Sequence, residues 1–355
     1  MLTSTIDLDA IAHNTRTLRA HTDAQLMCVV KADAYNHGVE RCVPVMEANG
    51  ADAFGVATFA EARRVRELTS KPVLAWLWDA GEDIPDGVDV GVPSIAHMRS
   101  LIDAPSAPTI YLKVDTGMHR SGIGEERWAE AFALAAQAQR QGKCTVAGLM
   151  THLACADDPS DPYTDVQAAA FRRAVAQARQ EGLAVERNHA ANSPATWTRP
   201  DLHFDMVRPG LSLYGLEPVD GLDHGLKPAM TWSAPVVVVK LMRKGEATSY
   251  ARTWVAPEDG FCAVVPAGYA DGVQRAWQGA LEVVIGERAY PQVGRVSMDQ
   301  IVIWLGDNAA HVAPGDEAVL FGDATALATR AGTINYEVVC APRGRTTRTY
   351  IGKGQ

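Results

Sequence analysis

Short apolar runs alternate with amphipathic segments along the first 225 residues of the chain. Between the runs, apolar positions recur at helical spacing, as at Val39, Val43 and Met46. The runs expected to form strands are 26–30, 53–58, 73–78, 88–92, 109–114, 145–150, 185–189 and 205–210. Strands that alternate with helices pair in parallel, so the pattern predicts an α/β fold, an N-terminal (β/α)8 TIM-like barrel.

The pattern changes after about residue 225. The runs expected as strands there are 236–241, 261–265, 281–285, 293–296, 301–304 and 318–321, with one helix expected at 325–331. The sequence therefore predicts two domains, a barrel at 1–225 and a mostly β C-terminal domain at 226–355. At the N-terminus, Asp7 or Asp9 is expected to cap a helix with Ile11 and Leu18 on one face.

Composition narrows the class of protein. The 355 residues are 47% hydrophobic and 21% charged, as is typical of a globular protein. A net charge of −9 disfavours nucleic acid as a partner, because phosphate binding needs basic surface. No stretch resembles a membrane span or a signal peptide, so a cytoplasmic location is expected. The six cysteines are scattered, which argues against disulfides and a metal site.

Reactive side chains gather where the expected strands end. Lys31 ends the first strand, and the other polar groups at these ends are Tyr35, Lys113, Asp115, Arg120, His152, Asn192, Ser193, Arg208 and Gly210. The active site of a (β/α)8 barrel lies at this end. One amine among cations, hydroxyls and backbone amides suits an anionic, phosphorylated carbonyl ligand. A lysine can form a Schiff base with an aldehyde cofactor, and Asn192, Ser193 and Gly210 could hold its phosphate.

Plainer explanations exist for each residue taken alone. Lys31 could extend into solvent, and Lys113 with Asp115 could form an ion pair at a strand end. His152 with Cys155 has poor metal-ligand spacing, and a satisfied core histidine is the simpler interpretation. The tyrosines that could simply pack in the second domain are Tyr250, Tyr269 and Tyr336.

Nine segments of the chain resemble, in order, the motifs of bacterial alanine racemases. These enzymes use pyridoxal 5′-phosphate (PLP) and combine a (β/α)8 barrel with a C-terminal β domain. The segments are VVKADAYNHG at 29–38, followed by 112–122, 150–154, 189–193, 207–211, 248–250, 266–272, 293–300 and 334–337. Any one of them is weak evidence, but nine in the family's order, with the domain change in the right place, are a strong signal.

The resemblance implies interconversion of L-alanine and D-alanine, which supplies D-alanine for peptidoglycan. Lys31 would hold PLP and act as one base, and Tyr250 from the partner subunit of a homodimer would be the other. The implied cofactor contacts are Tyr35, Ser193, Gly210, Leu211 and Tyr336 at the phosphate, Arg208 at the pyridine nitrogen, Arg120 at the phenolic oxygen, and His152 linking Tyr250 to Arg208. The implied substrate contacts are Arg120, Met298 and Tyr269, and Lys113 matches a lysine that is often carbamylated.

Other functions remain open on the sequence alone. A serine or broad-specificity racemase would share nearly all these motifs. A PLP-dependent decarboxylase of the same architecture is disfavoured by Arg208, and a non-catalytic PLP-binding carrier lacks a β domain. The chain departs from the family pattern at Asn36, Ser121 and Ser297, and Asn36 is expected to accept left-handed backbone.

Overall fold

The computed structural model describes residues 1–355, which divide into two compact units. A barrel unit contains residues 11–226, with the last residue, and a β unit contains residues 1–10 and 227–354. The sequence pattern placed the first ten residues with the barrel, whereas in the structure they belong to the β unit. None of the helices combines the length and the apolar character that crossing a bilayer requires.

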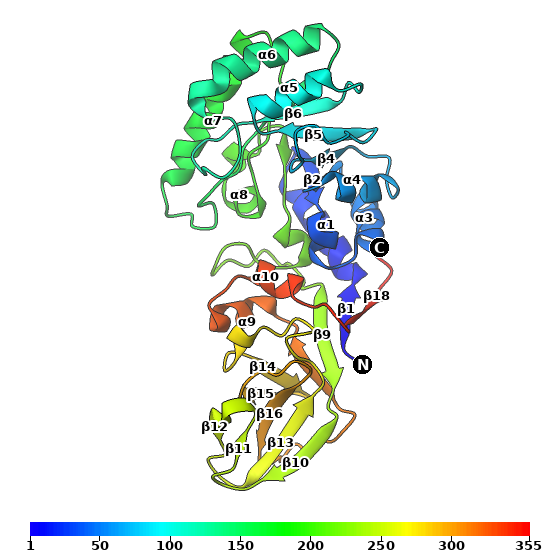
Figure 1. The fold of residues 1–355 in the computed structure, drawn as a ribbon, viewed down its shortest axis with the longest axis vertical. Coiled ribbons are helices and arrows are strands. Elements are labelled where there is room, and N and C mark those ends of the chain that lie inside the picture. Colours follow the sequence, from blue (N-terminus) through cyan, green and yellow to red (C-terminus); the bar gives the residue numbers. More distant parts are fainter. The chain divides into compact units, whose positions relative to one another are not determined.

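Seven parallel strands form the curved sheet of the barrel unit. They are β2 (Gln25–Val29), β3 (Ala53–Val56), β4 (Val73–Ala75), β5 (Val88–Val92), β6 (Thr109–Lys113), β7 (Thr145–Met150) and β8 (Met206–Val207), in the order β7-β6-β5-β4-β3-β2-β8. The helices are α1 (Leu8–His21), α2 (Lys31–Tyr35), α3 (Val39–Ala48), α4 (Phe59–Arg66), α5 (Ile95–Asp103), α6 (Trp128–Arg140), α7 (Tyr163–Gln180) and α8 (Ser193–Thr198). Of these, α5, α6 and α7 lie outside the sheet (Figure 1).

The strand expected at 185–189 is not a regular strand. Only His189 forms a β-bridge, with Met150 of β7. The segment nevertheless takes the place of a strand, because Thr151 N–H donates to the His189 carbonyl at 3.2 Å and Arg208 N–H donates to the Ala191 carbonyl at 2.9 Å. Since β8 pairs with β2, backbone hydrogen bonds run all the way round the barrel.

Buried apolar side chains fill the interior of the barrel. One residue from each of six strands contributes to this cluster, which consists of Met27, Ala53, Leu74, Tyr111, Met150 and Met206. Alternate residues of a strand point to opposite faces, so each strand also supplies residues that pack against the surrounding helices. The filled interior leaves the two ends of the barrel as the places where a ligand can bind.

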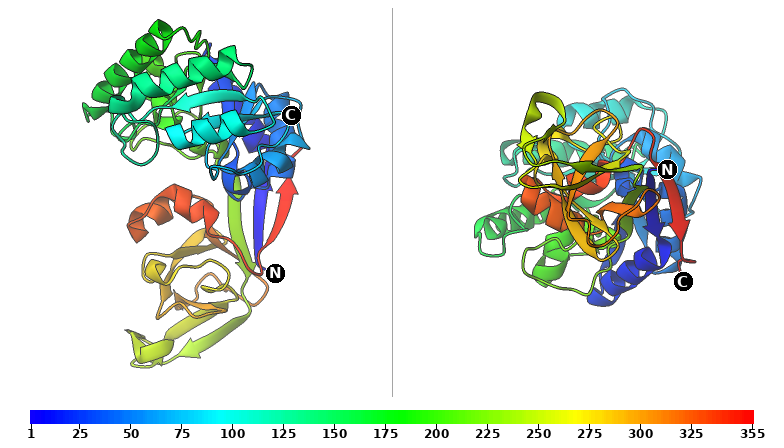
Figure 2. Two further views of the ribbon diagram at one scale, coloured as in Figure 1. Left: turned by 45° about the horizontal axis from the view of Figure 1, so that its top comes forward. Right: turned by 90° about the horizontal axis from the view of Figure 1, so that it is seen from below.

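The β unit is built on a nine-stranded sheet in the order β10-β13-β16-β15-β14-β17-β9-β1-β18. Its strands are β1 (Thr3–Asp7), β9 (Met230–Pro235), β10 (Val238–Met242), β13 (Gly260–Val265), β14 (Glu282–Ile285), β15 (Arg288–Val293), β16 (Ile301–Gly306), β17 (Glu317–Phe321) and β18 (Thr347–Ile351). β1 lies between β9 and β18 (Figure 2), pairing antiparallel with the first and parallel with the second. This placement explains why the first residues belong to the β unit.

Several expectations for local structure can be compared with this unit. The strand expected at 293–296 is wrong, because β15 ends at Val293. The helix expected at 325–331 is α9 (Ala324–Ala331), and a further helix, α10 (Asn335–Cys340), was not expected. The predicted cap of the first helix is Asp7, whose Oδ1 accepts the N–H groups of Asp9 and Ala10.

Candidate active site

A left-handed turn follows the candidate lysine. Lys31 is the second residue after β2 and begins the segment labelled α2, which is left-handed rather than a regular α-helix. The five residues that follow it are Ala32, Asp33, Ala34, Tyr35 and Asn36, with φ values of 52°, 58°, 56°, 51° and 67°. None of them is glycine, and left-handed backbone costs roughly 1–2 kcal/mol per residue for other amino acids. The expectation that Asn36 accepts this conformation is confirmed, but the sequence did not predict the turn itself. Strained backbone of this kind persists only where surrounding contacts hold it.

Hydroxyl and amide groups converge beyond this turn. The Tyr35 ring stacks on Tyr214 at 4.8 Å, and the Tyr214 hydroxyl donates to the Val29 carbonyl. A Cβ placed on Gly210 would lie only 2.4 Å from the Tyr35 hydroxyl oxygen, so the absence of a side chain lets the hydroxyl reach the backbone there. Gly210 N–H donates to Ser193 Oγ at 2.9 Å. Two hydroxyls and an amide therefore form a cradle that suits a phosphate.

Two further residues expected at the phosphate flank this cradle. Asn192 precedes α8, and its Oδ1 accepts the Ala195 N–H at 3.3 Å, so its side chain caps the helix. Leu211 follows Gly210 at the start of a 3-10 turn and is buried. The backbone of Leu211, rather than its side chain, is the part that could contribute to anion binding.

Cations surround His152 at the same end of the barrel. Burial lowers the pKa of His152 to about 3, with further lowering from Arg208, Arg120, Lys31 and Lys113 in that order. Burial also lowers the pKa of Lys113 to about 8, helped by Arg120, Arg208 and Lys31, while Asp115 opposes the change. The structure thus brings together the cationic residues that the sequence placed on separate strand ends. His152 is neutral at physiological pH in this field.

Arg208 is buried and held in one orientation. Its Nη1 donates to Nδ1 of His189 at 2.7 Å, and its Nη2 donates to the Thr151 carbonyl at 2.6 Å. Burial lowers the pKa of Arg208 to about 10, so the guanidinium stays charged near neutral pH. Burial and Arg208 hold the pKa of His189 well below its usual range, and the ring packs edge-on against Tyr111. Sequence reasoning did not assign a role to His189, although the residue opens one of the matched motifs.

The candidate base of the β unit lies on an exposed loop. Tyr250 follows β11 (Ala247–Thr248), precedes β12 (Trp254–Val255), and is 70% exposed within the single chain. Its neighbours Ser249, Ala251 and Arg252 all have positive φ, between 53° and 61°. A loop that holds three non-glycine residues in this strained conformation presents a large phenol to solvent, which is an arrangement that functional sites favour over ordinary packing.

The two candidate substrate residues of the β unit lie together. Tyr269 N–H donates to the Ser297 carbonyl at 3.0 Å, and Ala270 N–H donates to the Met298 carbonyl at 3.1 Å. Met298 is 52% exposed. The backbone of Gly268 also approaches this segment, because a Cβ there would lie 2.2 Å from the Met298 carbonyl oxygen. Tyr336, the remaining candidate, lies on α10 and is partly buried.

Arg345 joins the two segments that carry Tyr269 and Met298 through hydrogen bonds to two carboxylates. It donates to Asp271 at 2.7 Å and to Asp299 at 2.8 Å, just beyond the segments that carry Tyr269 and Met298. Asp271 is fully buried, and burial alone would raise its pKa, but the bonds from Arg345 and Gly268 lower it overall. No sequence pattern predicts this contact, because Arg345 is distant along the chain from both carboxylates.

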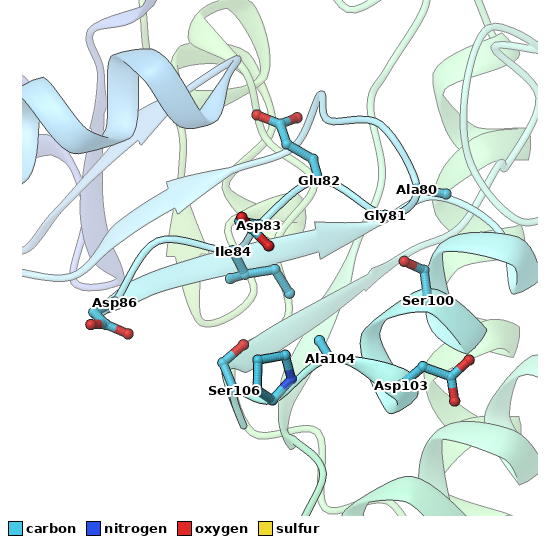
Figure 3. Close-up of a pocket in the computed structure, with 11 residues that line it drawn as sticks. Ala80, Gly81, Glu82, Asp83, Ile84, Asp86, Ser100, Asp103, Ala104 and Ser106 are labelled. Carbon is cyan, nitrogen blue, oxygen red and sulfur yellow. The ribbon is translucent and has the colours of Figure 1, made fainter.

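An open pocket of about 770 Å³ in the barrel unit lies between segment 80–86 and the end of α5, and none of the candidate site residues lines it. Its carboxylates belong to Glu82, Asp83, Asp86 and Asp103, and they point in different directions (Figure 3). No group of three histidine, cysteine, aspartate or glutamate side chains in the structure is arranged to hold a metal ion. The pocket joins segments that precede β5 and β6, and this N-terminal end of the strands is the end that barrels use for stability.

Comparisons with known proteins agree on one family. Residues 6–218 match the family model described as alanine racemase, N-terminal domain, and residues 229–350 match alanine racemase, C-terminal domain. A curated alanine racemase of Corynebacterium efficiens is 57% identical over 368 residues, covering the whole of both chains. One from Mycobacterium tuberculosis is 46% identical, covering 97% of this chain and 94% of its own.

Solved structures show the same similarity in three dimensions. The crystal structure of alanine racemase from Corynebacterium glutamicum superposes with a TM-score of 0.91 at 53% identity, covering 99% of both chains. The crystal structure of the alanine racemase from Streptomyces lavendulae gives a TM-score of 0.94 at 38% identity, covering 99% of this chain and 97% of the other. The predicted barrel with a mostly β C-terminal domain is confirmed by these matches.

Proposed function

Because this chain belongs to the alanine racemase family, and so interconverts L-alanine and D-alanine, we propose that it does so with PLP and two bases. Lys31 holds PLP and serves as one base, and Tyr250 of the partner subunit in a homodimer serves as the other. The observation that carries the proposal is the convergence of a lysine, a buried cation cluster and a phosphate-sized cradle at one end of the barrel.

The residues present fit the chemistry of PLP. The cradle of Tyr35, Ser193 and Gly210 would hold its phosphate, with the Tyr35 and Ser193 hydroxyls as donors and with Leu211, Asn192 and Tyr336 as further contacts. Arg208, which is charged and held by His189 and the Thr151 carbonyl, would present a donor to the pyridine nitrogen, and Arg120 would bind the phenolic oxygen. When bound, PLP acidifies the substrate Cα–H by drawing electrons into its ring. A negatively charged cofactor is bound best by a site with positive charge, and the cations around His152 provide such a site.

Two bases on opposite faces of the substrate account for the stereochemistry of racemisation. A proton must leave one face of the substrate Cα and another must arrive on the opposite face, which a single side chain could do only by crossing the molecular plane. Lysine and tyrosine have ordinary pKa values of about 10.4 and 10, so either acts near neutral pH only where cations favour its deprotonated form. Lys31 belongs to the same cationic cluster as Lys113, Arg120 and Arg208. In the proposed dimer, His152 would link Tyr250 of the partner subunit to Arg208.

The shared dimer site is supported by the exposure of the second base. Tyr250 is 70% exposed in a single chain, so most of its ring is accessible to a second chain. In the proposed dimer, the barrel unit of the partner chain would surround this ring. Exposed Met298 and Tyr269 belong to the same β unit and would bind substrate there, with the Met298 backbone amide and Arg120 receiving the carboxylate.

Substrate breadth is tested by chiral product analysis. We expect the protein to racemise L-alanine after PLP is restored to dialysed enzyme, with L-serine turned over at least about tenfold more slowly and L-lysine not measurably, since a poorly fitted side chain costs roughly 1–3 kcal/mol. Omitting PLP after dialysis is the matched control. Comparable kcat/KM values for alanine and serine would establish the alternative, a broad-specificity racemase. Activity that survives exhaustive PLP removal would contradict the cofactor assignment.

We also propose that Lys113 is carbamylated. Its lowered pKa of about 8 leaves part of the amine neutral, and a neutral amine attacks carbon dioxide to form an N–C bond while its proton passes to water. Its Nζ donates to Ser121 Oγ at 3.1 Å, so Ser121 holds the amine at a position where leucine is common in the family. The resulting anion would orient Arg120 and offset the local positive charge.

For Lys113 we expect a carbamate resonance in the ¹³C NMR spectrum of protein exposed to ¹³C-labelled carbon dioxide. At fixed dissolved carbon dioxide the signal should grow between about pH 6.5 and pH 8.5, because the neutral fraction of an amine with a pKa of about 8 rises over that range. Lys113→Arg, which keeps the charge, is the control and should lack the signal. A spectrum identical to that of this variant at every pH would refute the modification.

The family also suggests a place in the cell. We propose a cytoplasmic enzyme that supplies D-alanine for peptidoglycan, and two observations are consistent with this. None of the six cysteines forms a disulfide in the structure, as is usual in a reducing compartment. The relatives reported above are bacterial alanine racemases.

A further inference from the structure

The left-handed turn after Lys31 needs support from outside itself. Its internal hydrogen bonds include Asn36 N–H to the Ala32 carbonyl and Gly38 N–H to the Asp33 carbonyl, both at 2.9 Å. A right-handed turn would satisfy the same kinds of group without the steric conflict between Cβ and carbonyl oxygen. Neighbouring elements must therefore select the left-handed form, and α4 is an element whose polar side chains reach the turn.

Glu61 of α4 binds the first amide after the candidate lysine. Its Oε1 accepts the Ala32 N–H at 2.7 Å, and its Oε2 accepts the N–H groups of Ala57 and Thr58 at 2.9 and 3.0 Å. The Ala32 amide belongs to the peptide group that joins Lys31 to Ala32. One carboxylate thus ties the backbone beside Lys31 to the end of β3. Hydrogen bonds to an ionised acceptor are the stronger kind.

Arg64, one helical turn after Glu61, holds the other side of the turn. Its Nη2 lies 3.1 Å from Oδ1 of Asp33, the second residue of the left-handed run, and it also pairs with Glu40. The same Asp33 oxygen accepts the Val39 N–H at 3.0 Å, which joins the turn to the start of α3. Helix α4 therefore presents an acceptor to the amide of the turn and a cation to its carboxylate.

We infer that Glu61, assisted by Arg64, is a positioning residue for the racemase reaction. By fixing the peptide that follows Lys31 in its left-handed form, Glu61 sets the direction in which the lysine side chain leaves the backbone, and so the position of its amine. The inference deepens the proposed function and rests on the assignment of Lys31 as the PLP lysine. That Glu61 holds the turn follows from the hydrogen bond between its carboxylate and the Ala32 N–H.

Glu61→Gln is the test variant, because it isolates the carboxylate. Glutamine still supports the capping box with Thr58, so the start of α4 is kept. Its single acceptor oxygen cannot serve the Ala32 amide and the Ala57–Thr58 amides together. Thr58→Ala is the matched control, since it removes the cap and leaves the Ala32 bond intact. Glu67→Gln, at the exposed end of the same helix, controls for charge.

The first readout needs no cofactor. Hydrogen exchange in the PLP-free protein should be about tenfold faster or more for amides 32–36 in Glu61→Gln, the effect expected when a charge-assisted hydrogen bond is lost. The other barrel strands should be unchanged, as should amides 32–36 in both controls. If Glu61→Gln does not fold, Arg64→Met, which changes an exposed side chain, carries the same expectation.

The second readout joins the turn to function. The rate of covalent PLP capture, followed by absorbance, and kcat should both fall about tenfold or more in Glu61→Gln, with a smaller change in KM, and neither should fall in the controls. Unchanged exchange, or faster exchange with unchanged capture and kcat, would overturn the inference. Borohydride reduction and mass mapping of the wild type separate the two proposals: PLP found away from Lys31 refutes the cofactor assignment, whereas PLP on Lys31 with an unaffected Glu61→Gln variant refutes only the positioning role.

Discussion

Lys31→Ala is expected to lose covalent PLP capture and to reduce kcat/KM by about 10³-fold or more, since a positioned base contributes roughly 10²–10⁴-fold and the covalent link is lost as well. Lys113 is the other lysine of the cation cluster, but it is buried and engaged with Ser121. Mass mapping after borohydride reduction should therefore find no adduct in the variant. Lys143→Ala, on the segment before β7, is the control and should behave as the wild type. A wild-type absorbance band in Lys31→Ala would remove Lys31 from the site.

Tyr250→Phe should separate the two bases. PLP capture by Lys31 should be intact, while racemisation falls by about 10²–10⁴-fold because one face of the substrate has lost its proton carrier. Tyr269→Phe, in the same β unit, is the comparison and should have the smaller effect. The pair also shows whether exposure in the single chain marks the catalytic tyrosine, since Tyr250 is 70% exposed and Tyr269 is 37% exposed.

Mixing the two inactive variants tests whether the site is shared between subunits. In a hybrid of Lys31→Ala and Tyr250→Phe chains, one site carries both changes and the other carries neither. An equal mixture that exchanges freely forms hybrids in half of its dimers, so activity should recover to about a quarter of the wild-type value for a two-fold symmetric dimer. Proven subunit exchange without recovery would show that each site is built from one chain.

Arg208→Glu is expected to change which reaction the enzyme performs. The charged guanidinium cannot give up its proton near neutral pH, so in the proposed site it would leave the pyridine nitrogen unprotonated and limit the electron withdrawal by the ring. A carboxylic acid in its place would donate a proton there, and the returning proton would then reach the cofactor more often than the substrate Cα. We expect racemisation to fall by about 10²-fold or more and the ratio of pyruvate formed by transamination to racemised alanine to rise about tenfold or more.

Arg208→Lys is the matched control for this prediction. It keeps a positive charge but loses the fork that bonds His189 and the Thr151 carbonyl, so racemisation should weaken while the product ratio stays near that of the wild type. Circular dichroism of both variants checks that the buried position tolerates the change. An unchanged product ratio in a folded Arg208→Glu protein would show that Arg208 does not control the outcome.

The residues at the strand ends show which features of the site the sequence predicts. The residues Lys31, Lys113, His152 and Arg208 each lie at or just after the end of an apolar run. Parallel strands bring their carboxyl ends to one edge, so the gathering of these residues could be predicted from their order alone. The seventh run was expected to be a regular strand, but it pairs through His189 and scattered hydrogen bonds instead. Apolar periodicity records burial, and a buried segment need not have the geometry of a strand.

The contacts that hold the site could not be predicted from the sequence. In the structure Glu61 forms a capping box with Thr58, and nothing in the sequence marked its bond to Ala32 at another strand end. Arg345 is likewise distant along the chain from Asp271 and Asp299. Such bonds depend on side chains meeting across the fold, and their partners carry no periodic pattern.

By itself, the sequence determined the two kinds of domain, the family, and the residue types at the barrel mouth, because hydrophobic period and motif order are properties of the chain. Only the tertiary structure decided that Lys31 opens a left-handed turn held by α4, that Arg208 is locked by His189, and that the first strand joins the β unit. Each of these depends on which surfaces meet after folding. The candidate lysine, Lys31, could be identified from its position in the sequence. We infer that its orientation depends on the carboxylate of Glu61, thirty residues further along the chain.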